Sequence, residues 1–324
     1  MMKRNETLWI ACLFIVLGLL VGYHPWIGGN DQGDSTHVVE GTQRIVIDDW
    51  GRSVVVPAEA KRIVSLTSAY EPILLEMVGP SRLGAVSFLS KTKGYGPNYE
   101  LAKSVKVSLY SYAVEKIVYL HPDLVLAPEY TNRDVLDGLD HMGIPVVIVS
   151  SPKTVQGTLE LVERLGVVVG AEHKARDMTA KMQQDIEEVK ALSAETKGQV
   201  VISMSSMDGY AGSDSLFDDM TRVMGLVNGP SHLGYAPRTA FTEERIIEMD
   251  PNVILIPVYD KSEMAWQALY RDNPGLQTVR AVREGRVVTM PASDLYTGNQ
   301  FIGESMKDIL RILRESEKGD GTHE

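Results

Sequence analysis

One segment of this chain occurs twice. VEKIVYLHPDLVLAP at Val114–Pro128 matches EERIIEMDPNVILIP at Glu243–Pro257, an offset of 129 residues. Each copy predicts a helix, a turn that contains proline, and a short apolar strand. A supersecondary unit that repeats at the spacing of a domain favours two related lobes, with chance similarity between helix–strand units as the alternative.

Around each copy, short apolar strands alternate with helices, which is typical of a mostly parallel sheet covered on both faces. The fold class is therefore α/β, with two Rossmann-like lobes. In the first lobe, two strands within residues 44–57 precede strands at 62–66, 83–86, 124–127 and 146–149 and helices at 70–78, 113–119 and 132–141. In the second lobe, we expect strands at 200–204, 253–256 and 287–290 and helices at 216–224, 243–249 and 301–313.

A long helical segment separates the two series. Gly166 and Gly170 are expected to interrupt its first helix, and the second, residues 171–194, has apolar residues at three-to-four spacing. At ~1.5 Å per residue this second helix spans roughly 36 Å, about the width of a domain. We expect a rigid connector and a ligand cleft between the lobes. The predicted parts are 1–30 (leader), 44–153 (first lobe), 154–196 (connector) and 197–316 (second lobe).

The leader has the pattern of an export signal. Lys3 and Arg4 precede an apolar run of 16 residues, Leu8 to Tyr23, and a polar, Gly-rich stretch follows. The run is slightly shorter than the roughly 20 residues of a membrane-spanning helix, so a cleaved signal peptide and an uncleaved anchor both stay open. Cys12, the only cysteine, lies inside this run, and lipidation there is the less favoured interpretation. We expect an exported protein of the periplasm or the outer face of the cytoplasmic membrane.

The charge balance bears on the class of partner. The formal net charge is -11, and no basic stripe interrupts the sequence. Because phosphate binding needs clustered Lys and Arg, nucleic acid is not expected as a partner. The folded part has no cysteine, which excludes thiolate zinc sites and thiol catalysis.

Four motifs in order resemble the solute-binding family of ABC importers for iron-siderophore, haem and vitamin B12. They are IDDWGRSVVVPAEAKRIVSLTSAYEPILLEMVG, LHPDLVLAP, FTEERIIEMDPNVILIP and AVREGRVVTMP, and together they cover about Arg44 to Leu313. The chain departs from the family pattern at Ala69 and Tyr70, where small and Thr residues are usual, and at Asn252, which replaces an Asp. The resemblance implies two α/β lobes, one rigid helix between them, and a ligand in the cleft.

The resemblance also implies a permease-docking role for two glutamates. In the family, one glutamate in the first turn of a helix in each lobe meets arginines of the ABC permease dimer in the cytoplasmic membrane. Glu71 fits the first place and Glu244 the second, with Glu243 as a neighbour that can substitute. The alternative for Glu71 is a helix N-terminal acid that the helix dipole favours and that has no partner.

The ligand-binding candidates lie in loops after the strands, where open α/β sheets bind ligands. Tyrosine predominates in them; its ring packs against flat ligands and its hydroxyl offers a donor. The alternative for each tyrosine is an ordinary half-buried loop aromatic, and for His232 a surface histidine. The candidates are Tyr70, Tyr95, Tyr110, Tyr112, Tyr210, His232, Tyr235, Arg238, Tyr259 and Tyr296.

We therefore expect a monomeric carrier without a catalytic residue, metal site or cofactor of its own. Its ligand is a small-molecule metal chelate, with an iron complex such as a ferric siderophore favoured over haem and cobalamin. An exported α/β enzyme is the main alternative, although no phosphate loop, dinucleotide glycine pattern or nucleophile elbow occurs. Two acidic pairs, Asp48–Asp49 and Asp218–Asp219, are interpreted as solvated surface. A tethered sensor is the third alternative.

Overall fold

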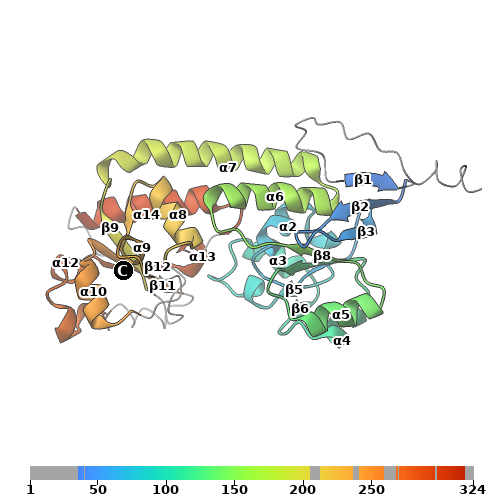
Figure 1. Cartoon of the computed structure of the whole chain (residues 1–324), viewed down its shortest axis with the longest axis horizontal. Helices are drawn as coiled ribbons and strands as arrows, with labels where there is room; N and C mark the ends of the chain where they lie inside the picture. The colour runs from blue at the N-terminus through green and yellow to red at the C-terminus, as the bar shows by residue number, and fades with distance from the viewer. Residues whose placement is uncertain are drawn as a thin grey trace, which may run out of the picture. The chain divides into compact units, whose positions relative to one another are not determined.

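The structure is a computed structural model that describes residues 36–39, 41–204, 212–235, 241–258, 268, 270–295 and 298–317, with only the backbone for 36–39 and 317. All of them belong to the unit Thr36–Glu324. Figure 1 shows their elements in order along the chain. The first lobe contains β1 (Thr36–Val39), β2 (Gln43–Ile47), β3 (Ser53–Pro57), β4 (Ile63–Ser65), α2 (Glu71–Met77), β5 (Val86–Ser87), α3 (Tyr99–Ser104), β6 (Ser108–Leu109), α4 (Val114–Tyr119), β7 (Leu124–Pro128), α5 (Arg133–His141) and β8 (Val146–Val149).

The central sheet of the first lobe is parallel, with the strand order β4-β7-β8, beside an antiparallel sheet β1-β2-β3 and the parallel pair β5-β6. Every residue of its central strand β7 is buried, and successive side chains face opposite sides of the sheet. Leu124 and Leu126 join the apolar cluster that contains Leu74 of α2, and Val125 joins the cluster that contains Ile117 of α4. Helices therefore cover both faces, as the unbroken apolar strands predict.

The second lobe repeats this arrangement with the strand order β10-β9-β11-β12, again parallel. Leu255 of β11 packs toward α8 and α14, whereas Ile254 packs toward α10. The predicted α/β class with two lobes is confirmed. The elements are β9 (Val200–Ser203), α8 (Leu216–Val223), β10 (Val227–Asn228), α9 (Gly229–His232), α10 (Glu243–Met249), β11 (Val253–Val258), α12 (Arg280–Arg283), β12 (Val287–Pro291), α13 (Ala292–Leu295) and α14 (Ile302–Glu317).

Helices α6 (Val155–Val169) and α7 (Glu172–Leu192) connect the two sheets. The expected break at Gly166 is wrong, because α6 runs through it and ends at Gly170, whose φ of 70° lies in the left-handed region. A Cβ on Gly166 would lie 2.3 Å from the Cβ of Ala175 in α7, so the glycine permits close helix packing. The larger apolar cluster continues along both helices from the first lobe into the second, so the connector packs against both lobes.

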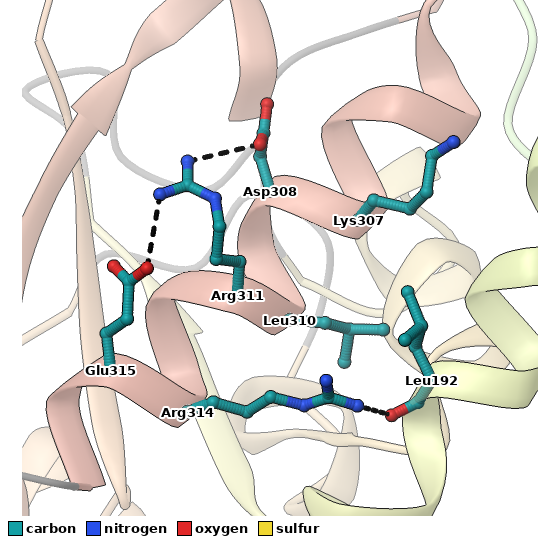
Figure 2. Close-up of a pocket in the computed structure, with 7 residues that line it drawn as sticks. All are labelled: Leu192, Lys307, Asp308, Leu310, Arg311, Arg314 and Glu315. Atoms are coloured by element: carbon teal, nitrogen blue, oxygen red, sulfur yellow. Dashed lines mark hydrogen bonds and ion pairs between the residues drawn. The ribbon is translucent and has the colours of Figure 1, made fainter.

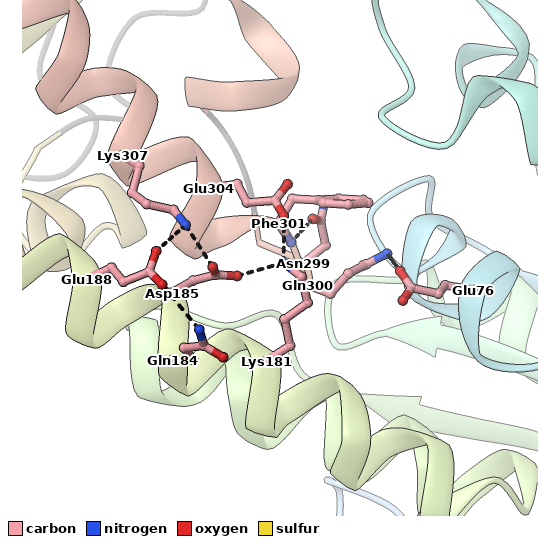
Figure 3. Close-up of polar contacts among 10 residues, drawn as sticks. All are labelled: Glu76, Lys181, Gln184, Asp185, Glu188, Asn299, Gln300, Phe301, Glu304 and Lys307. Carbon is pink, nitrogen blue, oxygen red and sulfur yellow. Dashed lines mark hydrogen bonds and ion pairs between the residues drawn. The ribbon is translucent and has the colours of Figure 1, made fainter.

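Polar contacts reinforce this connection (Figure 3). Asp185 of α7 is buried and accepts hydrogen bonds from Lys181 at 2.8 Å and from Lys307 of α14 at 2.7 Å. In the segment before α14, Gln300 donates to the backbone carbonyl of Pro72 in α2 at 2.9 Å and to Glu76 at 3.0 Å. The second lobe is thus hydrogen-bonded both to the connector and to a helix of the first lobe. Across the described ranges, no helix is both long and apolar enough to cross a membrane.

The two copies of the sequence repeat form the same unit. Residue 121 after α4 and residue 250 after α10 both have positive φ, 48° for His121 and 35° for Asp250. Two residues later, Asp123 and Asn252 each accept hydrogen bonds from the backbone that leads into the neighbouring strand. β7 then pairs with β4 and β11 with β9, in both cases in parallel. The sequence repeat is therefore accompanied by a repeat in backbone structure.

Candidate functional site

The carboxyl ends of the first lobe's strands surround a pocket of about 410 Å³. Residues after β4, β5, β6 and β7 all contribute, because parallel strands end on the same edge of a sheet. We call this the aromatic pocket. Its lining residues are Leu66, Thr67, Ser68, Ser87, Phe88, Leu89, Leu109, Tyr110, Tyr112, Pro128, Tyr130, Thr131, Asn132 and Val135.

Two aromatic rings form one wall of this pocket. Phe88 follows β5 and Tyr110 follows β6, and the two strands pair in parallel. Their rings are therefore neighbours and stack, with centroids 5.0 Å apart and planes 11° apart. Phe88 is 39% exposed and Tyr110 75% exposed, so the pair presents a large apolar surface to solvent. Exposed aromatics that converge on a concave surface are typical of ligand-binding sites.

The rest of the aromatic pocket is neutral. None of the described residues that line it is charged. Tyr112 is half-buried, and burial, with a smaller contribution from the charge of Glu71, raises the pKa of its hydroxyl, which stays protonated. Tyr130, 67% exposed, adds another ring. The pocket offers aromatic faces and hydroxyl donors, which suit a flat ligand with some polar edges.

A smaller pocket of about 160 Å³ adjoins this one through Ser68, which lines both. Residues of the first lobe, including Ser90 and Tyr95, and residues of the second lobe, including Ser293 and Asn299, line it together. We call it the inter-lobe pocket. The sequence-predicted Tyr95 lies here, and the predicted Tyr110 and Tyr112 lie in the aromatic pocket.

Tyr70 lines neither pocket. Its side chain is fully buried, and its hydroxyl donates a hydrogen bond to the backbone carbonyl of Val149 in β8. The prediction that Tyr70 binds ligand is therefore wrong for this structure, because a ligand cannot reach a ring enclosed by the core. A tyrosine in place of the family's usual threonine serves here to fill space between α2 and β8.

Glu71 is also buried, with 1% of its surface exposed. Its Oε1 accepts a hydrogen bond from the backbone N–H of Ser87 at 2.7 Å, and its Oε2 accepts one from the hydroxyl of Ser90. Burial raises the pKa of Glu71 to about 7, although both hydrogen bonds act in the opposite direction. The docking role predicted for Glu71 is contradicted, because an anion that meets a partner's arginines must reach the surface.

The repeat identifies another carboxylate that sequence analysis missed. At the offset of 129 residues, Glu115 corresponds to Glu244, and both are exposed in the first turns of α4 and α10. In Figure 1, both helices lie at the end of their lobe away from α7. Hydrogen bonds from its own backbone N–H and from Thr242 hold the pKa of Glu244 below its usual value, so its charge is fixed. Glu243 instead accepts a hydrogen bond from Asn273 at 2.7 Å.

The remaining predicted ligand-binding residues belong to the second lobe. His232 is exposed at the end of α9. Tyr235 is half-buried, its hydroxyl donates to Glu248 and its ring lies under the guanidinium of Arg245, 5.3 Å from the ring centroid. Neither residue lines the two pockets above. The others, Tyr210, Arg238, Tyr259 and Tyr296, lie outside the described residues.

Another groove, of about 400 Å³, lies between the ends of α7 and α14 (Figure 2). It contains several charged side chains, and each cation among them already has a partner. Arg311 contacts Asp308 at 3.2 Å and Glu315 at 3.4 Å, and Arg314 donates to the backbone carbonyl of Leu192. We interpret it as a surface of the connector. Within the described ranges, no group of three metal-ligating side chains lies together.

Comparison with known proteins shows which family this chain belongs to. The family described as "Periplasmic binding protein" matches residues 63–293. YvrC of Bacillus subtilis, an uncharacterized ABC transporter substrate-binding lipoprotein, is 27% identical, with 94% of this chain and 98% of YvrC covered.

Two solved structures share the fold. The haem-binding protein RhuT of Roseiflexus sp. RS-1 has a TM-score of 0.69 at 18% identity, over 79% of this chain and 99% of RhuT. The molybdate-binding protein MolA of Haemophilus influenzae has a TM-score of 0.71 at 16% identity, over 86% of this chain and 93% of MolA. The protein therefore belongs to the periplasmic binding protein family and is an exported substrate-binding component of an ABC importer.

Proposed function

We propose that this protein captures a metal chelate with a flat apolar face. An iron complex such as a ferric siderophore is favoured as the ligand over haem and cobalamin. The protein acts as a monomer and delivers the ligand to an ABC permease dimer. The observation that supports this ligand class is the stacked pair Phe88–Tyr110 in a pocket whose described lining residues carry no charge. An aromatic wall of this kind binds by ring contact and apolar burial. A bare oxyanion would instead require cations or several convergent donors.

The aromatic pocket and the inter-lobe pocket together give such a ligand two kinds of contact. The first offers rings and phenol groups, and the second adds polar side chains, among them Tyr95 and Asn299. A chelate has this mixed character, because its organic part is largely apolar while its edges carry oxygen or nitrogen atoms. The tyrosine-rich lining favours an iron complex, since phenol groups donate to the oxygen atoms that surround ferric iron.

For docking, we propose Glu115 of α4 and Glu244 of α10. They occupy equivalent places in the two copies of the repeat, and both are exposed. Two fixed carboxylates on separate lobes, joined by a stiff connector, present a defined spacing to arginines of a permease. Glu115 replaces Glu71 in this role.

The alternative of an exported enzyme receives less support. Asp48 accepts hydrogen bonds from the backbone of Trp50 and Arg52 within its own turn, at 3.0 and 2.8 Å. Asp219 accepts one from the backbone of Val155 at 2.7 Å. The paired acids thus organise turns and helix ends, and neither pair lines the aromatic pocket. A carrier that binds its ligand unchanged accounts for these contacts without a reaction.

Titration of the folded protein with haemin, cobalamin and several ferric siderophores tests the ligand class. Absorbance gives the affinity, and thermal unfolding gives an independent measure, because a ligand that binds only the folded state raises the unfolding temperature. We expect one class to bind at one molecule per protein and to be recovered chemically unchanged. No binding by any of them would refute the chelate proposal, and turnover of the ligand would favour the enzyme.

A further inference from the structure

Glu71 accepts hydrogen bonds from residues on both sides of Phe88, which forms part of the aromatic wall. Ser87 directly precedes Phe88, and its backbone N–H donates to Glu71 at 2.7 Å. Ser90 lies two residues after Phe88, and its hydroxyl donates to the other oxygen of the same carboxyl group. The Phe88 backbone itself is fixed by a hydrogen bond to the carbonyl of Leu109 at 2.9 Å. Removing Glu71 would therefore release the loop on both sides of the ring.

The two serines belong to different pockets. Ser87 lines the aromatic pocket and Ser90 lines the inter-lobe pocket. Glu71 is thus hydrogen-bonded to one lining residue of each pocket. Tyr112, which also lines the aromatic pocket, interacts with the side chain of Ser87. One buried carboxyl group therefore holds one lining residue of each pocket.

We propose that Glu71 is a positioning residue of the ligand site, which holds residues 87–90 so that Phe88 stacks on Tyr110. The expected effect on ligand affinity rests on the proposed function. The contact between Glu71 and the loop does not, because it exists without ligand. Glu71 does not touch the ligand, because it is buried beneath the loop.

The electrostatic surroundings make this anchor sensitive to pH. The groups that act on the Glu71 carboxyl are the serines 87 and 90, and the ionisable group that faces it is Tyr112, which stays neutral. The nearby Lys91 is turned away and donates to the carbonyl of Val105. Burial raises the pKa of Glu71 from 4.5 to about 7 in the closed loop. An opened loop would expose the carboxyl to water and return its pKa toward the ordinary value.

The sign of the pH effect follows from proton binding. Between pH 4.5 and about 7, the closed loop binds more protons than the opened loop, so rising pH favours opening. In the structure both Ser87 and Ser90 donate to the carboxyl; when the carboxyl is protonated, its O–H can donate to the Ser90 hydroxyl instead. A glutamine at position 71 can copy this state, since its carbonyl accepts from Ser87 and its amide donates to Ser90. It does not titrate.

Hydrogen–deuterium exchange of the ligand-free protein tests the proposal. In the wild type, amide protection of residues 87–90 should fall by at least about threefold between pH 6 and pH 8, after correction for intrinsic exchange. Glu71→Gln should keep these amides protected at both pH values, and Glu71→Ala should lose the protection. Ser90→Ala, which removes one of the two contacts, should give an intermediate result if Glu71→Ala fails to fold.

Asp185→Asn is the matched control, since Asp185 is another buried carboxylate but contacts lysines of α7 and α14. It should leave exchange at residues 87–90 unchanged. Unchanged protection in Glu71→Ala or Ser90→Ala, or an equal loss in Asp185→Asn, would overturn the positioning role. Haemin affinity, measured on the same variants, should decrease in those variants that lose amide protection at residues 87–90. Haemin that fails to bind the wild type would count against the haem alternative alone, while the exchange result still decides the role of Glu71.

Discussion

The two copies of the repeated unit share a backbone plan and differ in side chains. In both, a residue that follows the helix lies in the left-handed region, and an Asp or Asn two residues on accepts from the backbone at the start of the neighbouring strand. His121 has the left-handed place in the first copy. In the second, Asp250 has it and also accepts a hydrogen bond from the backbone of Arg280 at 2.8 Å. The shared backbone conformation therefore depends on where the hydrogen bonds are made, and several residue types can make them.

The comparison also separates two kinds of acidic residue. Glu115 and Glu244 are equivalent by the repeat and exposed, whereas Glu71 has no counterpart in the repeat and is buried. Exposed, symmetry-related carboxylates suit a partner that contacts both lobes. A buried carboxyl with internal donors suits the organisation of a loop.

The largest expected effect comes from reversing the charge of the equivalent pair. Glu115→Lys combined with Glu244→Lys should reduce ligand uptake by cells at least about a hundredfold, because each reversal replaces attraction to a permease arginine with repulsion. Ligand affinity in solution should stay unchanged. Radiolabelled or iron-dependent uptake, together with solution binding, measures the two effects separately.

Glu187→Lys is the control for charge alone, since Glu187 is exposed on α7 away from both helices. It should leave uptake near the wild-type value. Normal uptake by the double variant would contradict the proposal that Glu115 and Glu244 have equivalent docking roles in the two lobes.

A smaller effect should distinguish Asp123 from Asn252. Asp123 accepts two backbone hydrogen bonds, from Lys61 at 2.7 Å and Arg62 at 2.9 Å, whereas Asn252 accepts one, from Val200 at 2.7 Å. Asp123→Ala should lower the free energy of unfolding by about 2 kcal/mol and Asn252→Ala by about 1 kcal/mol. Asn252→Asp should change it by less than about 0.5 kcal/mol, because the same acceptor remains. Urea unfolding provides the values.

Asp137→Ala, at an exposed position of α5, controls for loss of a carboxylate without backbone contacts. Equal losses in Asp123→Ala and Asn252→Ala would show that the second hydrogen bond contributes little. The copies would then be energetically alike as well as similar in backbone.

Much of the fold could be predicted because apolar periodicity marks buried elements. The helix at 243–249 and the strand at 146–149 occur where expected, and the connector 171–194 corresponds to α7, Glu172–Leu192. Short edge elements such as β6 and β10 were missed, since two residues carry no periodic signal. Gly166 was misjudged because its effect depends on Ala175 of another helix.

The site was less predictable because exposure depends on distant contacts. Glu71 and Glu115 both lie in the first turn of a helix, but Ser87 and Ser90 pack over Glu71 and bury it, whereas Glu115 is exposed. The repeat did contain the signal for Glu115, since the offset of 129 pairs it with Glu244. Tyr110 and Tyr112 could be predicted from their place after a strand, but stacking of Phe88 on Tyr110 required the parallel pairing of β5 and β6.

The most direct measurement of the central claim is the dissociation constant of the bound chelate after removal of the aromatic wall. Phe88→Ala combined with Tyr110→Ala should weaken binding at least about tenfold, because stacking contacts and apolar burial are both lost. Tyr119→Ala removes a tyrosine that is 81% exposed on α4 and outside the aromatic pocket, and it should leave the constant unchanged. An unaltered dissociation constant in the double variant would contradict the claim that this pocket holds the ligand.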